Sequence, residues 1–193
     1  MGRPSVKAER TEVILTAFES CVARFGVEGT SLERIAEASG MSRSLLRHNI
    51  GNRDELVDAM AVRFITRYEQ STSEWLSYLP EEKPSVALVE SLFSEDNGNW
   101  ESVLVAEALI ASAQSYPKVQ TLLHDWYEGM LLSMSQVLES EHPKASAAEC
   151  WDVMVAIVGI YFNTDSLRSL ALSGRHREAG LAMSHRLLAS LPC

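Results

Sequence analysis

The stretch TSLERIAEASGMSRSLLRHNIGNRDELV, residues 30–57, decides the fold that we predict for this chain of 193 residues. Gly40 divides it into two short helical segments, and the second segment runs from Ser42 to about Asn49. That segment is too short to hold a core and is rich in hydrogen-bond donors. Its residues therefore point to a role other than ordinary packing.

The two sides of this segment differ in chemistry. Helical spacing places Leu45, Leu46 and Ile50 on one side, where they can dock on Ile35 and Ala36 of the preceding segment. The opposite side carries the donors Arg43, Ser44, Arg47 and His48. A thin helix with one anchored side and one donor-rich side meets the physical requirement for entering the DNA major groove.

The residues before this stretch predict one longer helix. Apolar residues recur at helical spacing from Ser5 to Phe25, and Gly26 and Gly29 are expected to end the helix. Thr30 followed by Glu33 matches a capping box, which predicts the start of the second helix. The first fifty residues therefore hold three helices.

Charge is distributed unevenly along the chain. The formal net charge is -9, yet residues 1–53 contain eight basic and six acidic residues, so the remainder carries -11. Such asymmetry is typical of a chain with one segment suited to an anionic partner.

The rest of the chain predicts long helices only. A fourth helix is expected from Asn52 to about Leu79, and no alternating pattern suggests a strand. Breaks separate four further long segments and a last one, and they fall at Pro84, Asn97-Gly98, Pro117, Pro143 and Gly174. We predict an all-α protein with a helix-turn-helix domain over residues 1–52 and a helical bundle over residues 53–193.

The order of residues from about 8 to 57 resembles the N-terminal domain of TetR-type transcriptional regulators. The match runs through Thr30, the pair Ile35-Ala36, Gly40, Ser42 and Leu56 in the start of the next helix. The chain departs from the family pattern at four positions: Arg47 and Asn49 replace aromatic residues, Ile50 replaces Phe, and Arg53 replaces the usual phosphate-binding Lys. Arginine can also bind phosphate, with more donors than lysine.

The resemblance implies a set of DNA contacts. Thr30 and Ser31 are expected to bind phosphate at the start of the second helix, and His48 and Arg53 to touch the DNA backbone. Candidates for the base edges or the groove are Ser42, Arg43, Ser44 and Arg47, of which Arg43 is the best suited to guanine.

Two further positions leave alternatives open. Asn49 either contacts adenine or caps the end of its helix. The basic segment Gly2-Arg3-Pro4, with Lys7, is either a minor-groove arm or a disordered tail.

The resemblance also implies a small-molecule cavity in the C-terminal bundle and, with it, a small and largely apolar effector. Aromatic, methionine and polar positions at helical spacing are the candidates for its lining, although each of them is also suited to an ordinary core. These candidates are Trp75, Trp100, Glu107, Trp126, Tyr127, Met130, Met134, Trp151, Met154, Tyr161, Phe162 and Asn163.

The last two predicted helices, Ala147–Leu172 and His176–Leu191, are where the family forms its homodimer. Small residues that permit close packing recur along them: Ala156, Gly159, Ala171, Ala179, Gly180, Ala182 and Ala189. A two-fold dimer would place two recognition helices about 34 Å apart, which predicts a palindromic double-stranded operator.

The sequence also bears on other classes of protein: secreted and membrane proteins, disulfide-linked or zinc-binding proteins, and enzymes. No signal sequence and no apolar run of membrane-spanning length is visible, so we expect a cytoplasmic protein without membrane contact. The three cysteines are far apart, which argues against disulfides and a zinc site, and no cofactor motif appears. The alternatives are a helical metal enzyme, for which Glu139 and His142 have a suitable spacing, and a helical adaptor that has lost DNA binding.

Overall fold

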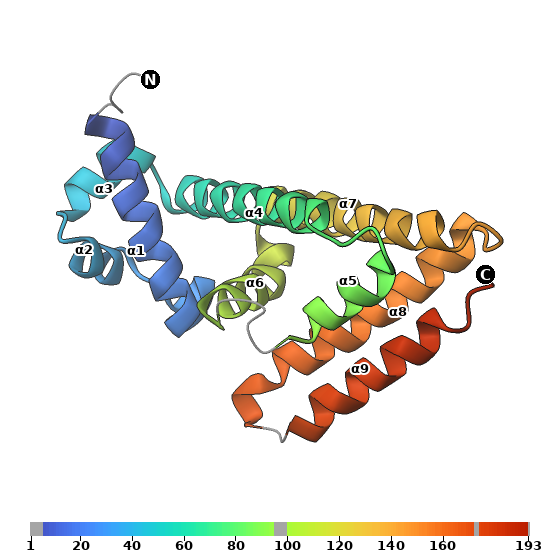
Figure 1. Ribbon diagram of the computed structural model, residues 1–193. Coiled ribbons are helices and arrows are strands. Elements are labelled where there is room, and N and C mark those ends of the chain that lie inside the picture. Colours follow the sequence, from blue (N-terminus) through green and yellow to red (C-terminus); the bar gives the residue numbers. More distant parts are fainter. Residues whose placement is uncertain (1–5, 95–99, 172–173, 193) are drawn as a thin grey trace. The chain divides into compact units, whose positions relative to one another are not determined.

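The computed structural model describes residues 6–94, 100–171 and 174–192, and across these residues the chain forms α-helices and two 3-10 turns without any strand (Figure 1). The all-α fold class predicted from the sequence is confirmed. The helices are α1 (Val6–Gly29), α2 (Leu32–Ser39), α3 (Arg43–Ile50), α4 (Arg53–Ser77), α5 (Pro84–Leu92), α6 (Trp100–Ser112), α7 (Pro117–Glu141), α8 (Ala147–Ser166) and α9 (Gly174–Leu188).

The helices belong to two compact units. Unit 1 comprises residues 1–67 and 99–124, and unit 2 comprises residues 68–98 and 125–193. Helix α4 therefore contributes its first part to unit 1 and its remainder to unit 2. The domain boundary at residue 52 stays a prediction.

Unit 1 is organised around α1, which contacts α2, α3 and α6. Its buried stripe includes Ile14, Phe18 and Val22, each at most 1% exposed, as the helical spacing predicts. The backbone breaks from helical geometry at Gly26, and a further turn of helix then ends at Gly29, so both predicted glycines interrupt or end α1. This further turn brings the end of α1 close to the beginning of α2.

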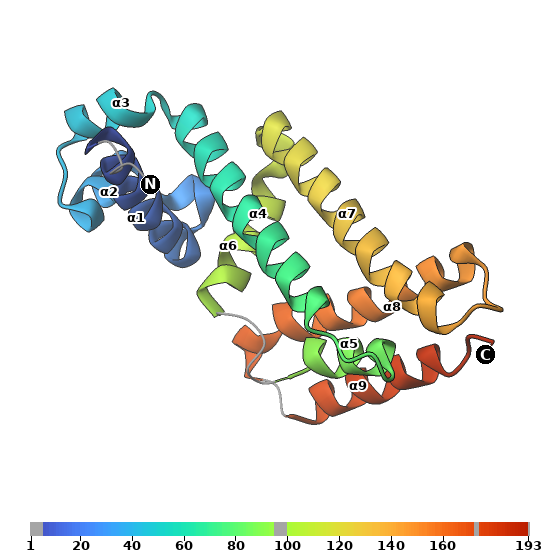
Figure 2. The ribbon, with the colours of Figure 1, turned by 45° about the horizontal axis from the view of Figure 1, so that its top comes forward.

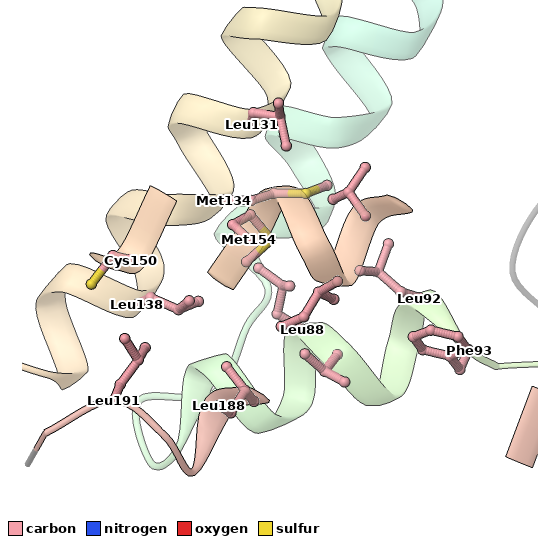
Figure 3. Close-up of a cluster of buried hydrophobic side chains, with 13 residues drawn as sticks. Leu88, Leu92, Phe93, Leu131, Met134, Leu138, Cys150, Met154, Leu188 and Leu191 are labelled. Carbon is pink, nitrogen blue, oxygen red and sulfur yellow. The ribbon is translucent and has the colours of Figure 1, made fainter. Parts of the chain in front are cut away.

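Unit 2 has its own hydrophobic core, made by α5, α7, α8 and α9 (Figure 3). The cluster includes Leu88 and Leu92 of α5, Leu138 of α7 and Leu188 of α9. Two residues that we predicted as ligand-pocket lining, Met134 and Met154, lie inside this core and are at most 3% exposed. Six more pack against it as partly buried side chains: Trp75, Tyr127, Met130, Trp151, Tyr161 and Phe162.

The last two helices differ at their ends from the prediction. Helix α8 ends at Ser166, followed by a 3-10 turn at Arg168–Leu170, and Gly174 begins α9 instead of breaking the chain before it. Leu172, the Asn97-Gly98 break and the Gly2-Arg3-Pro4 arm lie outside the described residues. None of the described helices has an apolar stretch long enough to cross a membrane.

Candidate nucleic-acid interface

Helix α2 begins one residue later than the capping-box pattern predicts. Its N-cap is Ser31, whose Oγ accepts a hydrogen bond from the Arg34 amide at 3.3 Å. Thr30 is fully buried, and its hydroxyl donates to the Gly26 carbonyl at 2.8 Å. The predicted Thr30 capping box is therefore wrong, and the Thr30 hydroxyl is not presented to a phosphate. Ser31, partly exposed at the helix start, stays a predicted phosphate contact.

The turn between α2 and α3 depends on local signals that the sequence contains. Gly40 has φ 66° and ψ 17°, a left-handed conformation that glycine adopts without the strain of a side chain. Ser42 then caps α3 by accepting a hydrogen bond from the Leu45 amide at 3.3 Å, and its Oγ lies 2.9 Å from the Ser44 Oγ. The predicted start of this helix is confirmed.

Helix α3 has the two faces that its spacing predicts. Leu46 is buried, and Leu45 and Ile50 are partly buried, in a helix that contacts both α1 and α2. Figure 2 shows α3 joined to the start of α4, with α1 and α2 in the same group. The predicted groove and backbone contacts Ser42, Arg43, Ser44, Arg47 and His48 are all exposed.

Arg43 is exposed but has an acidic partner in the free protein. Its Nη1 forms an ion pair with the Glu33 Oε1 of α2, and the two side chains remain 62% and 57% exposed. The pKa of Glu33 lies below its usual range because of a hydrogen bond with its own backbone, then the Ser31 hydroxyl, and then Arg43. Ion pairs at such exposure are weak because water screens the charges, so a DNA acceptor can replace Glu33.

The end of α3 is held by its own side chains and backbone. The Asn49 Nδ2 donates to the Leu45 carbonyl at 2.7 Å, one turn earlier in α3, and the Gly51 amide donates to the Arg47 carbonyl at the helix end. Asn52 and Glu55 then exchange hydrogen bonds of 2.7 and 2.9 Å between side chains and amides, the reciprocal pattern of a capping box at the start of α4.

We expect Gly51→Ala to destabilise this junction. Gly51 has φ 99°, and a Cβ built there would overlap the Glu55 carboxylate that caps α4. The strain and the lost cap together are expected to cost about 2 kcal/mol in urea unfolding. Gly129→Ala is the matched control, because its Cβ meets no neighbour and alanine favours the helix. Equal stability of the two variants would contradict this account of Gly51.

Arg53 lies in a different environment from that expected of a phosphate contact. Its Nη1 donates to the Thr30 carbonyl at 2.6 Å and its Nη2 to the Val27 carbonyl at 2.5 Å, and Glu28 lies 3.8 Å away. The side chain is 31% exposed. Both terminal nitrogens therefore already donate within the protein, which the sequence pattern did not reveal.

The structure does not gather the predicted effector-binding residues around one cavity. Trp100 and Glu107 lie on α6 of unit 1, whereas the other ten belong to unit 2. A cavity of about 680 Å³ lies between the C-terminal part of α8 and the N-terminal part of α9. Among the described residues, Asn163 is the one predicted candidate that lines it.

Two arginines that the sequence analysis missed line this cavity. They are Arg168 and Arg177, and the Arg177 Nη1 also donates to the Phe93 and Ser94 carbonyls at 3.1 and 2.7 Å. The buried Asp165 carboxylate lies 3.6 Å from the same guanidinium. These contacts join residues more than ten positions apart, so no local motif could indicate them.

Metal-binding side chains do not cluster in the part of the chain that the structure describes. No three His, Cys, Asp or Glu side chains in residues 6–94, 100–171 and 174–192 lie close enough to hold one ion. Cys21 and Cys150 are free and buried, and burial raises the pKa of both thiols.

Part of the chain is similar in sequence to a helix-turn-helix repressor. The chain is 34% identical over 61 residues to the HTH-type transcriptional repressor AcnR of Corynebacterium efficiens, and this match covers 32% of each protein. The match therefore spans about a third of the relative's length. No family model matches the chain.

Solved structures extend the likeness to nearly the whole chain. A TetR transcription regulator from Haloarcula marismortui has a TM-score of 0.77 at 14% identity, covering 95% of this chain and 98% of its own. A proposed transcriptional regulator from Saccharomonospora viridis, in complex with choline, has a TM-score of 0.79 at 13% identity, covering 94% and 96%. At these identities the likeness establishes the fold, and the resemblance to TetR-type regulators is confirmed at that level.

Proposed function

Because the chain has the fold of TetR-type transcriptional regulators, we propose that it is a DNA-binding transcriptional repressor that acts as a homodimer and responds to a small molecule. The observation that carries this proposal is the exposed donor face of α3, backed by the buried Leu46. The proteins that share its fold are transcriptional regulators and not enzymes, which favours this function over the metal enzyme.

DNA contacts by α3 follow from its exposed side chains. The Arg47 side chain is exposed, and its guanidinium makes no hydrogen bond or ion pair with another described residue, so it is available for phosphate or the groove. Arg43 can exchange Glu33 for the O6 and N7 acceptors of guanine. Ser42, Ser44 and His48 add donors along the same face.

Unbiased selection of bound DNA tests this proposal directly. Purified protein is incubated with random duplexes at low salt, and bound sequences are enriched over several rounds. We expect a palindrome whose half-sites are about one helical turn apart, because a two-fold dimer repeats the α3 contacts at that distance. Failure to enrich any sequence would favour the adaptor alternative.

Arg43→Ala is expected to weaken binding to the selected sequence by about 1 to 3 kcal/mol and to relax the preference at one base pair. Its matched partner variant is Glu33→Gln, which removes the competing carboxylate and is expected to raise the affinity for every duplex. Gel shift with the selected duplex and with single-base variants measures both effects. Equal loss on all sequences for Arg43→Ala would exclude a base contact.

The homodimer is proposed from the exposed faces of α8 and α9. Val155, Ala156 and Gly159 are exposed on α8, and Ala182 and Met183 are exposed on α9. Contiguous small and apolar residues at the surface are typical of helix packing between subunits. Gly180 does not belong to this face, because it is buried and its Cβ position is closed by Phe93 and Ile160.

An effector site in unit 2 is proposed from two observations. The cavity between α8 and α9 has a volume suited to a small molecule. A protein of the same fold binds choline. Because α4 belongs to both units, a change in unit 2 can be transmitted along α4 to α3, with a coupling of about 1 to 3 kcal/mol.

A thermal-shift screen tests the effector. Choline and a panel of small apolar and amphipathic molecules are added to the protein, and each stabilising compound is then assayed for release of operator DNA. At least one compound is expected both to raise the Tm and to weaken operator binding. Stabilising compounds that all leave the operator affinity unchanged would contradict ligand responsiveness.

A further inference from the structure

We propose that Arg53 is a positioning residue, which holds the two ends of the helix-turn-helix segment together, and that it does not bind DNA phosphate. This inference rests on the proposed role of α3 in DNA binding. We call its hydrogen bonds to the Val27 and Thr30 carbonyls the Arg53 bridge.

The Arg53 bridge connects the residues just before α2 with the residue that begins α4, just after α3. Val27 lies in the last turn of α1 and Thr30 just before α2, whereas Arg53 is the first residue of α4. The hydrogen bonds span 23 and 26 positions of sequence, and residues 31–52 between them contain the whole of α2 and α3. The bridge therefore holds the start of α4, which follows this segment, against the end of α1, which precedes it.

Arginine suits this position because carbonyl oxygens at the end of α1 can accept further hydrogen bonds. The Val27 carbonyl receives one from the Thr30 amide at 3.2 Å and has a second lone pair for Arg53, and the helix dipole makes this end negative. The planar guanidinium presents donors in a fixed fork, so it can satisfy both carbonyls at once. A lysine ammonium on a flexible stem does not present two donors in such a fork.

Helix α3 depends on such an external restraint. Of its eight residues only Leu46 is fully buried, so its own packing contributes little to its position. At the N-terminal side the Gly40 turn and the Ser42 cap restrain it, and at the C-terminal side the chain passes through Gly51 to Arg53. Without the bridge, only the apolar contacts of α2 and α3 would hold these helices against α1.

A phosphate contact by Arg53 would compete with the bridge. Both terminal nitrogens donate to carbonyls, and the side chain is 31% exposed. Arg47 is the opposite case, because its side chain is exposed on α3 and its guanidinium has no partner among the described residues. The two arginines are therefore expected to differ in every measurement that separates positioning from phosphate binding.

The test compares Arg53→Ala, Arg53→Lys and Arg47→Ala in the full chain. Three quantities are measured for each variant: the Tm, hydrogen exchange of the α2 and α3 amides without DNA, and the affinity for the selected duplex as a function of salt. Far-UV circular dichroism confirms that each variant is folded.

For Arg53→Ala we expect the Tm to fall by about 5 °C and the α2 and α3 amides to exchange about tenfold faster. DNA affinity should fall about tenfold with an unchanged slope of log affinity against log salt. Arg53→Lys should recover part of each loss. Arg47→Ala should keep the Tm and the exchange rates, while its salt slope becomes shallower by about one.

A shallower salt slope for Arg53→Ala, with unchanged Tm and exchange rates, would overturn the proposal and restore the phosphate contact. The exchange measurement needs no DNA, so it decides the bridge even if the wild-type chain binds no duplex. In that case the proposed function fails, and the structural role of Arg53 is judged separately.

Discussion

Glu19→Ala is expected to lower the free energy of unfolding by about 3 kcal/mol, because it leaves buried positive charge without its main partner. Glu19 of α1 forms ion pairs with Arg63, and with Arg67 at 2.7 Å, both on the part of α4 that belongs to unit 1. The Glu19 side chain is only 11% exposed, and that of Arg63 only 17%. Burial by itself lowers the pKa of Arg63, but the hydrogen bond and charge of Glu19 raise it above the usual value.

Glu12→Ala is the matched control for this variant. Glu12 contacts the same arginine, at 2.8 Å from its Nε, but its side chain is 62% exposed. An exposed ion pair contributes about 0 to 1 kcal/mol, so this variant should be close to wild type. Urea unfolding followed by circular dichroism measures both variants. A loss for Glu12→Ala as large as that for Glu19→Ala would show that burial is not the cause.

The second large effect is expected from Ala182→Glu, which should dissociate the proposed dimer. In a two-fold interface each residue near the axis faces its own copy or a close neighbour, so the substitution places like charges opposite one another. Ala182 is exposed on α9, next to the exposed Met183. A monomer loses the gain from binding two half-sites together, so affinity for the palindrome should fall about 100-fold or more.

Leu132→Glu provides the comparison for Ala182→Glu. Leu132 is 51% exposed on α7, outside the proposed dimer face. Sedimentation equilibrium at micromolar concentration should show a monomer for Ala182→Glu and a dimer for Leu132→Glu. A dimer in both cases would place the interface elsewhere.

Features that act within one or two helical turns were predictable from the sequence. Ser42 caps α3 and Gly40 adopts the left-handed turn, because both depend on residues three or four positions away. The spacing of Leu46 against Arg43 and Arg47 likewise determined the buried and exposed faces of α3. These local signals were sufficient for the helix-turn-helix and the all-α fold.

Contacts between distant residues were not predictable in the same way. Arg53 has the same local sequence whether it binds phosphate or the carbonyls of Val27 and Thr30, and only the packing of α1 against the start of α4 decides between them. Thr30 and Ser31 are both suitable helix caps, and the burial of Thr30 selects Ser31.

The effector-binding candidates illustrate the same division in unit 2. Aromatic and methionine side chains at helical spacing fit a core and a cavity equally well, since both require apolar surface on one side of a helix. Met134 and Met154 became core because four helices meet around them, while a cavity lies where α8 and α9 border Asn163. The sequence by itself determined which face of each helix is apolar or donor-rich. Only the tertiary structure decided which other helix, cavity or side chain lies against that face, because these contacts come from residues far away along the chain.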